Sequence, residues 1–217
     1  MEGGYQEALY LQLNRNIHKY KGTAEAIRRN PKTTIDISGS VNQWDDVEYV
    51  QTSLGVKYMD RDAYSGSQIV RYRQTAPLDK IMELKVAHDD ANVYFDIKCK
   101  GKLSSFKNRD NWLNILIGTG EPESKVWESY EYVIGRDPAE ETLSVAALNG
   151  DFSSREVGRA SISRFANMIQ VSVPRSLMKL DKESSFYFKV AMGVSDMSDI
   201  MNSYRTGSAM PMGRLSY

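Results

Sequence analysis

Trp127 and its neighbours are the residues of this sequence whose types best suit ligand binding. The indole follows a turn-rich loop, Gly118–Ser124, and charged side chains flank it. An aromatic face beside hydrogen-bonding side chains can stack on a sugar ring while those neighbours hold the hydroxyl groups. Trp127 is therefore a candidate stacking ring for a sugar, with Glu128, Tyr130 and Arg136 as candidate hydrogen-bonding neighbours. The alternative is that Trp127 anchors its loop by folding back on the sheet.

Two loop carboxylates, Asp60 and Asp62, are the candidate metal site. They lie two residues apart in a long polar excursion from Thr52 to Pro77. Hard carboxylate oxygens suit Ca²⁺, so a structural calcium ion is the alternative to the ordinary solvated loop that we expect here. We expect no other cofactor. Cys99 is the only cysteine and falls on the apolar face of an alternating segment, so we expect a buried, unreactive thiol.

The residue sets that catalysis needs are missing. The two histidines, His18 and His88, are far apart in sequence, and no HExxH, glycine-rich phosphate loop or GxSxG motif occurs. Adjacent carboxylates diverge in an extended chain and do not make a catalytic pair; these neighbours are Asp45 and Asp46, Asp89 and Asp90, and Glu140 and Glu141. We predict a protein without catalytic activity. A hydrolase that uses the Asp-rich loops and a haem site at His88 are the alternatives.

Charge and composition argue against two classes of partner. The 217 residues carry 28 basic and 28 acidic side chains, so neither nucleic acid nor anionic lipid is an expected partner. No apolar run approaches the roughly 20 residues of a membrane span, so no membrane insertion is expected. Residues 1–4 lack the basic and then apolar start of a signal peptide. We expect either a cytoplasmic protein or an excised piece of a larger exported chain.

Two alternating segments define the expected fold. Apolar and polar residues alternate from Ile81 to Ala87 and from Val93 to Cys99, and a polar turn, His88–Asn92, joins them. Alternation places the apolar side chains on one face of each strand, and Asp and Asn favour turns. A third run, Trp112–Ile117, is apolar on both faces, as a covered central strand would be. These segments predict an antiparallel hairpin at the centre of a sheet.

We expect about nine or ten strands in all, with no long helix between them. Seven further strands are expected at Thr34–Ile37, Val41–Val50, Tyr130–Arg136, Thr142–Ala147, Arg159–Ser163, Ile169–Val173 and Phe186–Met192, and Ile69–Arg73 is a strand candidate within the polar excursion. Regularly spaced strands separated by turns predict an all-β fold, an antiparallel β-sandwich.

The first 32 residues differ in type from the rest. Leu9, Leu13, Ile17 and Tyr20 recur at helical spacing and form one apolar stripe, and Gly22 stands where a left-handed cap ends a helix. We therefore divide the chain into a helical lead-in or linker, residues 1–32, and a β-sandwich domain, residues 33–217. The lead-in is expected to pack against this domain or against a neighbouring one.

Eight segments, taken in order, carry a resemblance to a known family. They are Ile35–Gly39, Trp44–Val47, Leu84–Phe95, Asn111–Leu113, Trp127–Ile134, Val173–Arg175, Asp199–Met201 and Gly213–Arg214. Through these segments the sequence resembles family 9 carbohydrate-binding modules, in the divergent version found at the C-terminal end of large exported bacterial proteins. The resemblance spans nearly the whole chain.

The resemblance implies a jelly-roll-like sandwich without catalysis, joined in the parent chain to a catalytic domain that degrades polysaccharide. It implies a polysaccharide or oligosaccharide as ligand, structural calcium, and an extracellular, periplasmic or cell-surface location. The chain departs from the family at Gly118 and Gly120, where an Asp-Thr-Asp sequence is common. This departure and the apolar lead helix motivate a second hypothesis, a structural or interaction module that packs on a neighbouring domain and binds no glycan.

Overall fold

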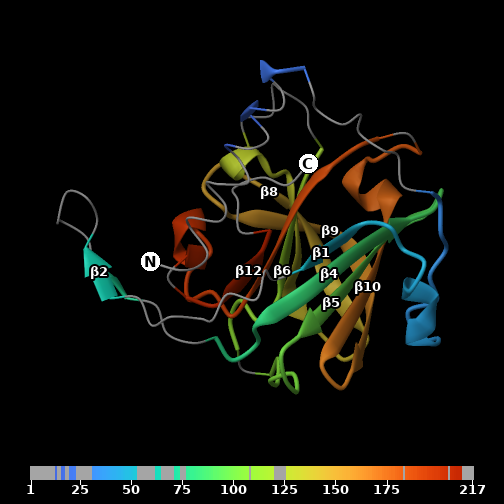
Figure 1. Ribbon diagram of the computed structural model, residues 1–217, viewed down its shortest axis with the longest axis horizontal. Helices are drawn as coiled ribbons and strands as arrows, with labels where there is room; N and C mark the ends of the chain where they lie inside the picture. Colours follow the sequence, from blue (N-terminus) through green and yellow to red (C-terminus); the bar gives the residue numbers. More distant parts are fainter. Residues whose placement is uncertain are drawn as a thin grey trace.

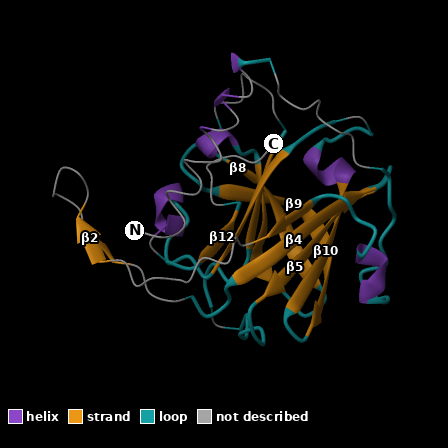
Figure 2. Ribbon diagram, viewed as in Figure 1, coloured by secondary structure: helices purple, strands orange, loops and turns teal. Residues whose placement is uncertain are grey.

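The structure is a computed structural model, and it describes residues 13, 16–17, 20–22, 31–52, 62–64, 71–73, 77–107, 109–119, 126–182, 184–204 and 206–211. Antiparallel strands dominate this part of the chain, and the helical elements that join them are short 3-10 turns (Figure 2). The predicted all-β, antiparallel class is therefore confirmed. In the same residues, no helix is long and apolar enough to cross a membrane.

Ten of the described strands form one continuous sheet in the order β1-β4-β5-β10-β9-β8-β7-β6-β11-β12. Their bounds are β1 Val50–Thr52, β4 Ile81–His88, β5 Asn92–Cys99, β6 Asn114–Gly118, β7 Tyr132–Pro138, β8 Thr142–Leu148, β9 Ser154–Phe165, β10 Met168–Pro174, β11 Tyr187–Met192 and β12 Ser208–Met210. Two further strands, β2 (Asp62–Tyr64) and β3 (Arg71–Arg73), pair with each other. The strands β6 to β10 form a meander, and the hairpin β4–β5 adds to its β10 side.

The two ends of the ten-stranded sheet approach each other (Figure 1). At the start of β4, the Ile81 N–H donates a hydrogen bond of 3.0 Å to the Ser208 Oγ of β12. The expected sandwich thus takes the form of one continuous, nearly closed sheet. Its interior holds the main apolar core, to which Leu84, Phe95 and Ile134 contribute fully buried side chains.

The central hairpin matches its prediction closely. The structure has strands at Ile81–His88 and Asn92–Cys99 where alternation indicated them. The Asp89 carboxylate accepts hydrogen bonds from the N–H groups of Ala91 and Asn92 at 2.8 and 2.7 Å, so the Asp-rich turn closes on itself. The Asp89 carboxylate also accepts a hydrogen bond from the Tyr94 hydroxyl at 2.7 Å. Because its oxygens are used in these bonds, Asp89 stabilises the turn.

Two predicted strands near the start of the domain are wrong. Thr34–Ile37 pairs with no strand, and Val41–Trp44 is a 3-10 helix, η1. The side chain of Ser40 caps this turn by accepting from the Asn42 N–H at 3.3 Å. Local side-chain hydrogen bonds of this kind compete with strand pairing, and alternation of apolar residues alone does not reveal them.

The lead-in helix is described at only four positions. Leu13, Asn16, Ile17 and Tyr20 have helical backbone, and the Lys21 N–H donates to the Ile17 carbonyl at 2.9 Å. Gly22 follows at φ 67°, which is the left-handed cap that the sequence predicted. The rest of the predicted helix, including Leu9, lies outside the described residues.

Each outer face of the curled sheet has its own cover. On β6, β7, β8 and β11, an apolar cluster is covered by η2 (Trp127–Ser129) and by the segment around η4 (Ile200–Tyr204); we call this the apolar outer face. On β4 and β5, residues 31–49 lie over a smaller cluster that includes Trp44 and Tyr94. We call the outward side of β4, β5, β10 and β9 the polar outer face, because polar side chains dominate it.

Candidate functional site

The structure places Trp127 inside the apolar outer face. Its side chain is 6% exposed, and its ring centroid lies 4.4 Å from that of Phe152. The indole Nε1–H donates to the Ser198 carbonyl at 3.2 Å, which ties η2 to the segment before η4. These contacts describe the loop anchor that was the alternative prediction, since little of the ring remains for a ligand to stack on.

The three predicted neighbours of Trp127 lie around the same cluster. Tyr130 is fully buried, and its ring centroid is 6.5 Å from that of Trp127. The Arg136 guanidinium lies 4.2 Å from the centroid of Phe152, and its Nη1 donates to Ser154 at 2.6 Å. Burial lowers the pKa of Arg136. Glu128 is half-buried at φ 54°, so all four residues belong to one packed region rather than to an open aromatic platform.

The predicted calcium site lies almost entirely outside the described residues. Asp60 falls in an undescribed stretch, and only the backbone of Asp62, in β2, is described. Among the described side chains, no group of three or more potential metal ligands occurs. The calcium site therefore remains a prediction from the sequence.

A groove of about 710 Å³ opens where β9 runs past the start of β8. Strand β8 begins at Thr142, which pairs with Ser161, whereas β9 continues to Phe165. The lining residues come from the cover, from β8 with the turn before it, and from β9: Ile37, Ser38, Glu140, Glu141, Thr142, Ser161, Ile162, Ser163 and Arg164. The unequal lengths of the two strands thus create a recess on an otherwise continuous sheet.

One wall of the groove is held by ion pairs. Arg164 Nη2 lies 2.9 Å from Glu140 Oε2, and Lys107 Nζ lies 3.0 Å from Glu140 Oε1. The hydrogen bond from Lys107, and then the charges of Lys107 and Arg164, lower the pKa of Glu140. The Arg164 guanidinium also stacks 4.2 Å from the centroid of Phe106. These contacts fix Arg164 and Glu140 as structural parts of the wall.

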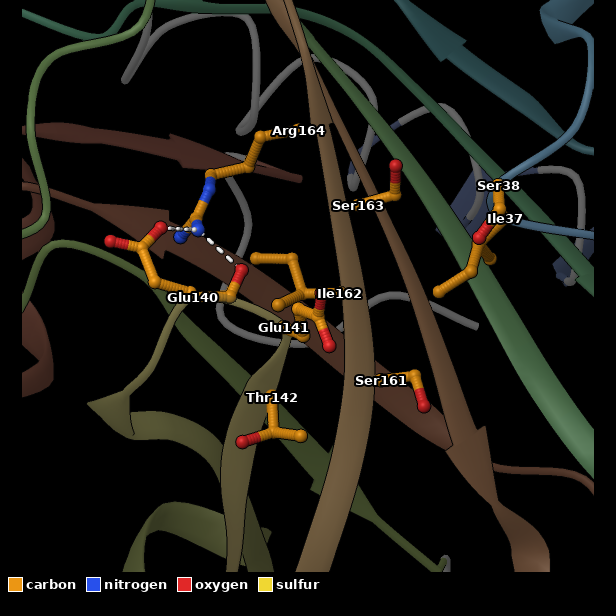
Figure 3. A pocket seen from close by; sticks show the side chains of 9 residues that line it. All are labelled: Ile37, Ser38, Glu140, Glu141, Thr142, Ser161, Ile162, Ser163 and Arg164. Carbon is orange, nitrogen blue, oxygen red and sulfur yellow. Dashed lines mark hydrogen bonds and ion pairs between the residues drawn. The ribbon is translucent and has the colours of Figure 1, made fainter.

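Hydroxyl groups and one carboxylate supply the rest of the groove's polar surface. Figure 3 shows Ser161 and Ser163 on the side of the β9 ribbon where Ile37 and Ser38 lie, while Arg164 and Glu140 meet on the other side. Hydroxyls both donate and accept hydrogen bonds, and an ionised carboxylate such as that of Glu141 accepts them. This lining suits a neutral, hydroxyl-bearing ligand.

Phe165 is the exposed aromatic residue that sequence reasoning missed. Its side chain is 65% exposed and stands at the end of β9, next to the groove. Side chains alternate along a strand, so Ser161, Ser163 and Phe165 share the outward face while Ile162 points into the core. The sequence signal was present, because Phe165 falls in phase with the two serines rather than with the apolar residues.

Next to the groove, the polar outer face contains two buried polar side chains. Asp96 pairs across the sheet with Gln170, which in turn pairs with Ser163 of the groove. Asp96 is 2% exposed and Gln170 is 3% exposed, and Asp96 Oδ1 and Gln170 Oε1 have no hydrogen-bond partner in the described structure. Burial, followed by the charge of Glu83, raises the pKa of Asp96 to about 6.

Searches against models of known protein families and against curated protein sequences find no match to this chain.

Proposed function

We propose that this protein is a non-catalytic carbohydrate-binding module that acts as an accessory domain of a larger, exported polysaccharide-processing protein. The observation that carries the proposal is the alignment of the exposed Phe165 ring with Ser161 and Ser163, two hydroxyl residues that line the groove. A sugar presents an apolar ring face and a rim of hydroxyl groups, so an aromatic platform beside hydroxyls and a carboxylate matches both parts. The resemblance to family 9 carbohydrate-binding modules supports the same class of ligand.

The proposal moves the binding site away from Trp127. A stacking residue must present a ring face to solvent, and Phe165 does so whereas Trp127 and Tyr130 do not. In the proposal, Phe165 stacks on one sugar ring of the polysaccharide. Ser161, Ser163 and Glu141 bind the hydroxyl groups of the neighbouring sugars. The adjacent catalytic domain supplies the chemistry, and the extracellular or periplasmic location follows from a polymeric substrate outside the cell.

A binding screen with matched variants tests this proposal. Soluble and insoluble polysaccharides are offered to the wild type, to Phe165→Ala and to Tyr20→Ala, which removes a ring that is 91% exposed in the lead-in. Loss of the stacking ring should weaken binding by about 1 kcal/mol, or roughly fivefold in Kd. The Tyr20→Ala variant should bind like the wild type. Equal binding by Phe165→Ala and the wild type would refute this site.

The second candidate, a structural module that binds no glycan, rests on the lead-in helix. Leu13, Ile17 and Tyr20 are 57%, 40% and 91% exposed, so the described part of the apolar stripe faces solvent. A neighbouring domain of the parent protein would cover it. This reading predicts that no sugar raises Tm, since only a ligand of the folded state stabilises it, and that a longer chain including the neighbour melts at a higher temperature.

A further inference from the structure

Four lysines occur on the segments at the end of the sheet where Phe165 lies. Lys98 is an exposed residue of β5, and Lys100 and Lys102 are exposed in the loop that follows. The Lys100 N–H donates to the Lys80 carbonyl at 2.9 Å, which brings the segment before β4 to the same place. We call Lys80, Lys98, Lys100 and Lys102 the lysine patch.

The exposed lysines of the patch are Lys98, Lys100 and Lys102. In the described structure, no carboxylate forms an ion pair within 4.0 Å of Lys98, Lys100 or Lys102. Burial and then the charge of Lys100 lower the pKa of Lys80, as expected for two ammonium groups held near each other. Charges of one sign on a small surface attract ligands of the opposite sign.

Hydrogen bonds place the Phe165 ring beside this patch. Asn167, in the turn after Phe165, receives the Cys99 N–H at 2.8 Å and donates its side-chain amide to the Cys99 carbonyl at 2.9 Å. Met168 pairs with Phe165 on one side and with Lys98 on the other. In Figure 1 the β9–β10 turn and the end of β5 lie at the same edge of the molecule. Phe165 therefore lies between the groove and the lysine patch.

Asp96 lies two residues before Lys98 on β5, is 2% exposed, and interacts with the charge of Lys98, which lowers its pKa against the larger effect of burial. Other carboxylates near this region are already engaged or lie further along the groove. Asp79 is buried against Ser104 and Arg109, and Glu140 pairs with Lys107 and Arg164. Glu83 faces Lys98 across the β4–β5 pair without an ion pair. Glu141 lies in the groove beside Ile162, whose N–H donates to the Glu141 carbonyl at 3.0 Å. The site thus has a cationic end and a neutral-to-acidic, hydroxyl-lined end.

We infer that the proposed glycan site is built for an anionic glycan, a polysaccharide whose sugars carry carboxylate or sulfate groups. Its anionic group lies at the lysine patch, a sugar face stacks on Phe165, and uncharged hydroxyls enter the groove toward Ser163 and Glu141. This inference rests on the proposed function and names its ligand class. A bilayer would meet the lysines and Phe165 but would leave the hydroxyl-lined groove unused, so an anionic lipid surface fits less of the site.

Pairs of polysaccharides that differ only in charge test the inference. Polygalacturonate is compared with its fully methyl-esterified form, and dextran sulfate with dextran. The wild type should bind the charged member of at least one pair tenfold or more tightly. Raising the salt from about 50 mM to about 500 mM should weaken that binding, because exposed charges are screened. Equal binding of the charged and neutral members would overturn the anionic-ligand inference and leave the carbohydrate proposal standing.

Two double variants that each remove two positive charges test whether the lysine patch causes the preference for the charged polymer. The double variant Lys100→Gln/Lys102→Gln should lose five- to tenfold in affinity for the charged polymer. The control Lys179→Gln/Lys182→Gln removes two exposed lysines after β10, at the opposite end of that strand, and should change affinity less than twofold. Equal losses in both double variants would show general polyelectrolyte attraction and overturn the inference. So would charged-polymer binding that Phe165→Ala leaves unchanged.

Two remaining outcomes separate the inference from the proposed function. Binding to phosphatidylserine vesicles, with no binding to any polysaccharide, would assign the patch to a lipid surface and overturn both. A folded wild type that binds neither charged nor neutral polysaccharides would overturn the proposed function itself. Far-ultraviolet circular dichroism and Tm establish folding of each variant, and the substituted lysines are exposed, so we expect Tm to stay close to that of the wild type.

Discussion

The two outer faces of this sheet bury aromatic residues against similar strands but differ in what they leave open. On the apolar outer face, Trp127 packs against Phe152 and is sealed by the segment before η4. On the polar outer face, residues 31–49 cover only part of the sheet, and the uncovered part holds the groove and Phe165. The difference teaches that an aromatic residue next to charged residues marks a binding site only if its ring remains exposed.

The largest expected effect comes from removing the ring that seals the apolar outer face. Trp127→Ala deletes a side chain that is 6% exposed, and such truncations cost about 3–5 kcal/mol of folding free energy. Denaturant unfolding monitored by circular dichroism measures this loss. Trp127→Phe keeps a six-membered ring in the cluster and removes the pyrrole part of the indole with its bond to Ser198, so its loss should be clearly smaller. A stable Trp127→Ala variant that loses only glycan binding would reverse our comparison of the two faces.

The next effect depends on pH and concerns the polar outer face. The pKa of Asp96 is raised from 3.8 to about 6 because burial and then Glu83 disfavour its ionised form. The folded state therefore holds its proton more tightly than the unfolded state, and the stabilisation present below pH 4 is lost as the pH rises through about 6. Asparagine does not ionise, so the stability of Asp96→Asn should not fall in this pH range. Above pH 6 the free energy of unfolding of the variant should therefore exceed that of the wild type by roughly 2 kcal/mol.

Unfolding free energies of the wild type and Asp96→Asn between pH 4 and pH 8 check this prediction. Glu83→Gln provides a control, since it removes a charge that raises the pKa of Asp96 and should move the transition to lower pH. Parallel pH profiles for the wild type and Asp96→Asn would show that Asp96 does not titrate in this range.

The sequence predicted the centre of the sheet better than its covers. Alternation from Ile81 to Cys99 located β4 and β5 almost to the residue, because those strands bury one face against the core whatever lies on the other. The segment Val41–Trp44 failed because Ser40 and neighbouring side chains make a local turn there. The periodicity of apolar residues predicts strands, whereas this turn depends on individual hydrogen bonds that periodicity does not reveal.

The candidate site was harder to predict because burial depends on distant segments. Trp127 is sealed by Phe152 and by the Ser198 carbonyl, which lie 25 and 71 positions further along the chain. Nothing in the residues around Trp127 indicates those contacts. The groove likewise results from unequal lengths of β8 and β9, whereas the exposure of Phe165 follows directly from its phase with Ser161 and Ser163.

Phe165→Ala sharpens the comparison by separating binding from stability. Because the ring is 65% exposed, its removal should change the unfolding free energy by less than about 0.5 kcal/mol. The same change should weaken glycan binding by about 1 kcal/mol. Trp127→Ala should show the opposite balance, with a large stability loss and unchanged affinity in the folded fraction. Calorimetric titration and thermal melts on both variants distinguish a binding aromatic residue from a packing one.

The smallest expected effect comes from a single hydroxyl of the groove. Ser163→Ala removes one hydrogen-bonding group from the lining, and a bond of this kind contributes about 0.5–1.5 kcal/mol. We expect a two- to fivefold weaker Kd, because water replaces part of the lost interaction. Ser172→Ala is the matched control: Ser172 shares the polar outer face, pairs with Ser161 across β9 and β10, and lies outside the groove lining. If both variants weaken binding equally, the ligand occupies the sheet surface rather than the groove. If only Ser163→Ala weakens binding, the ligand binds in the groove beyond the start of β8.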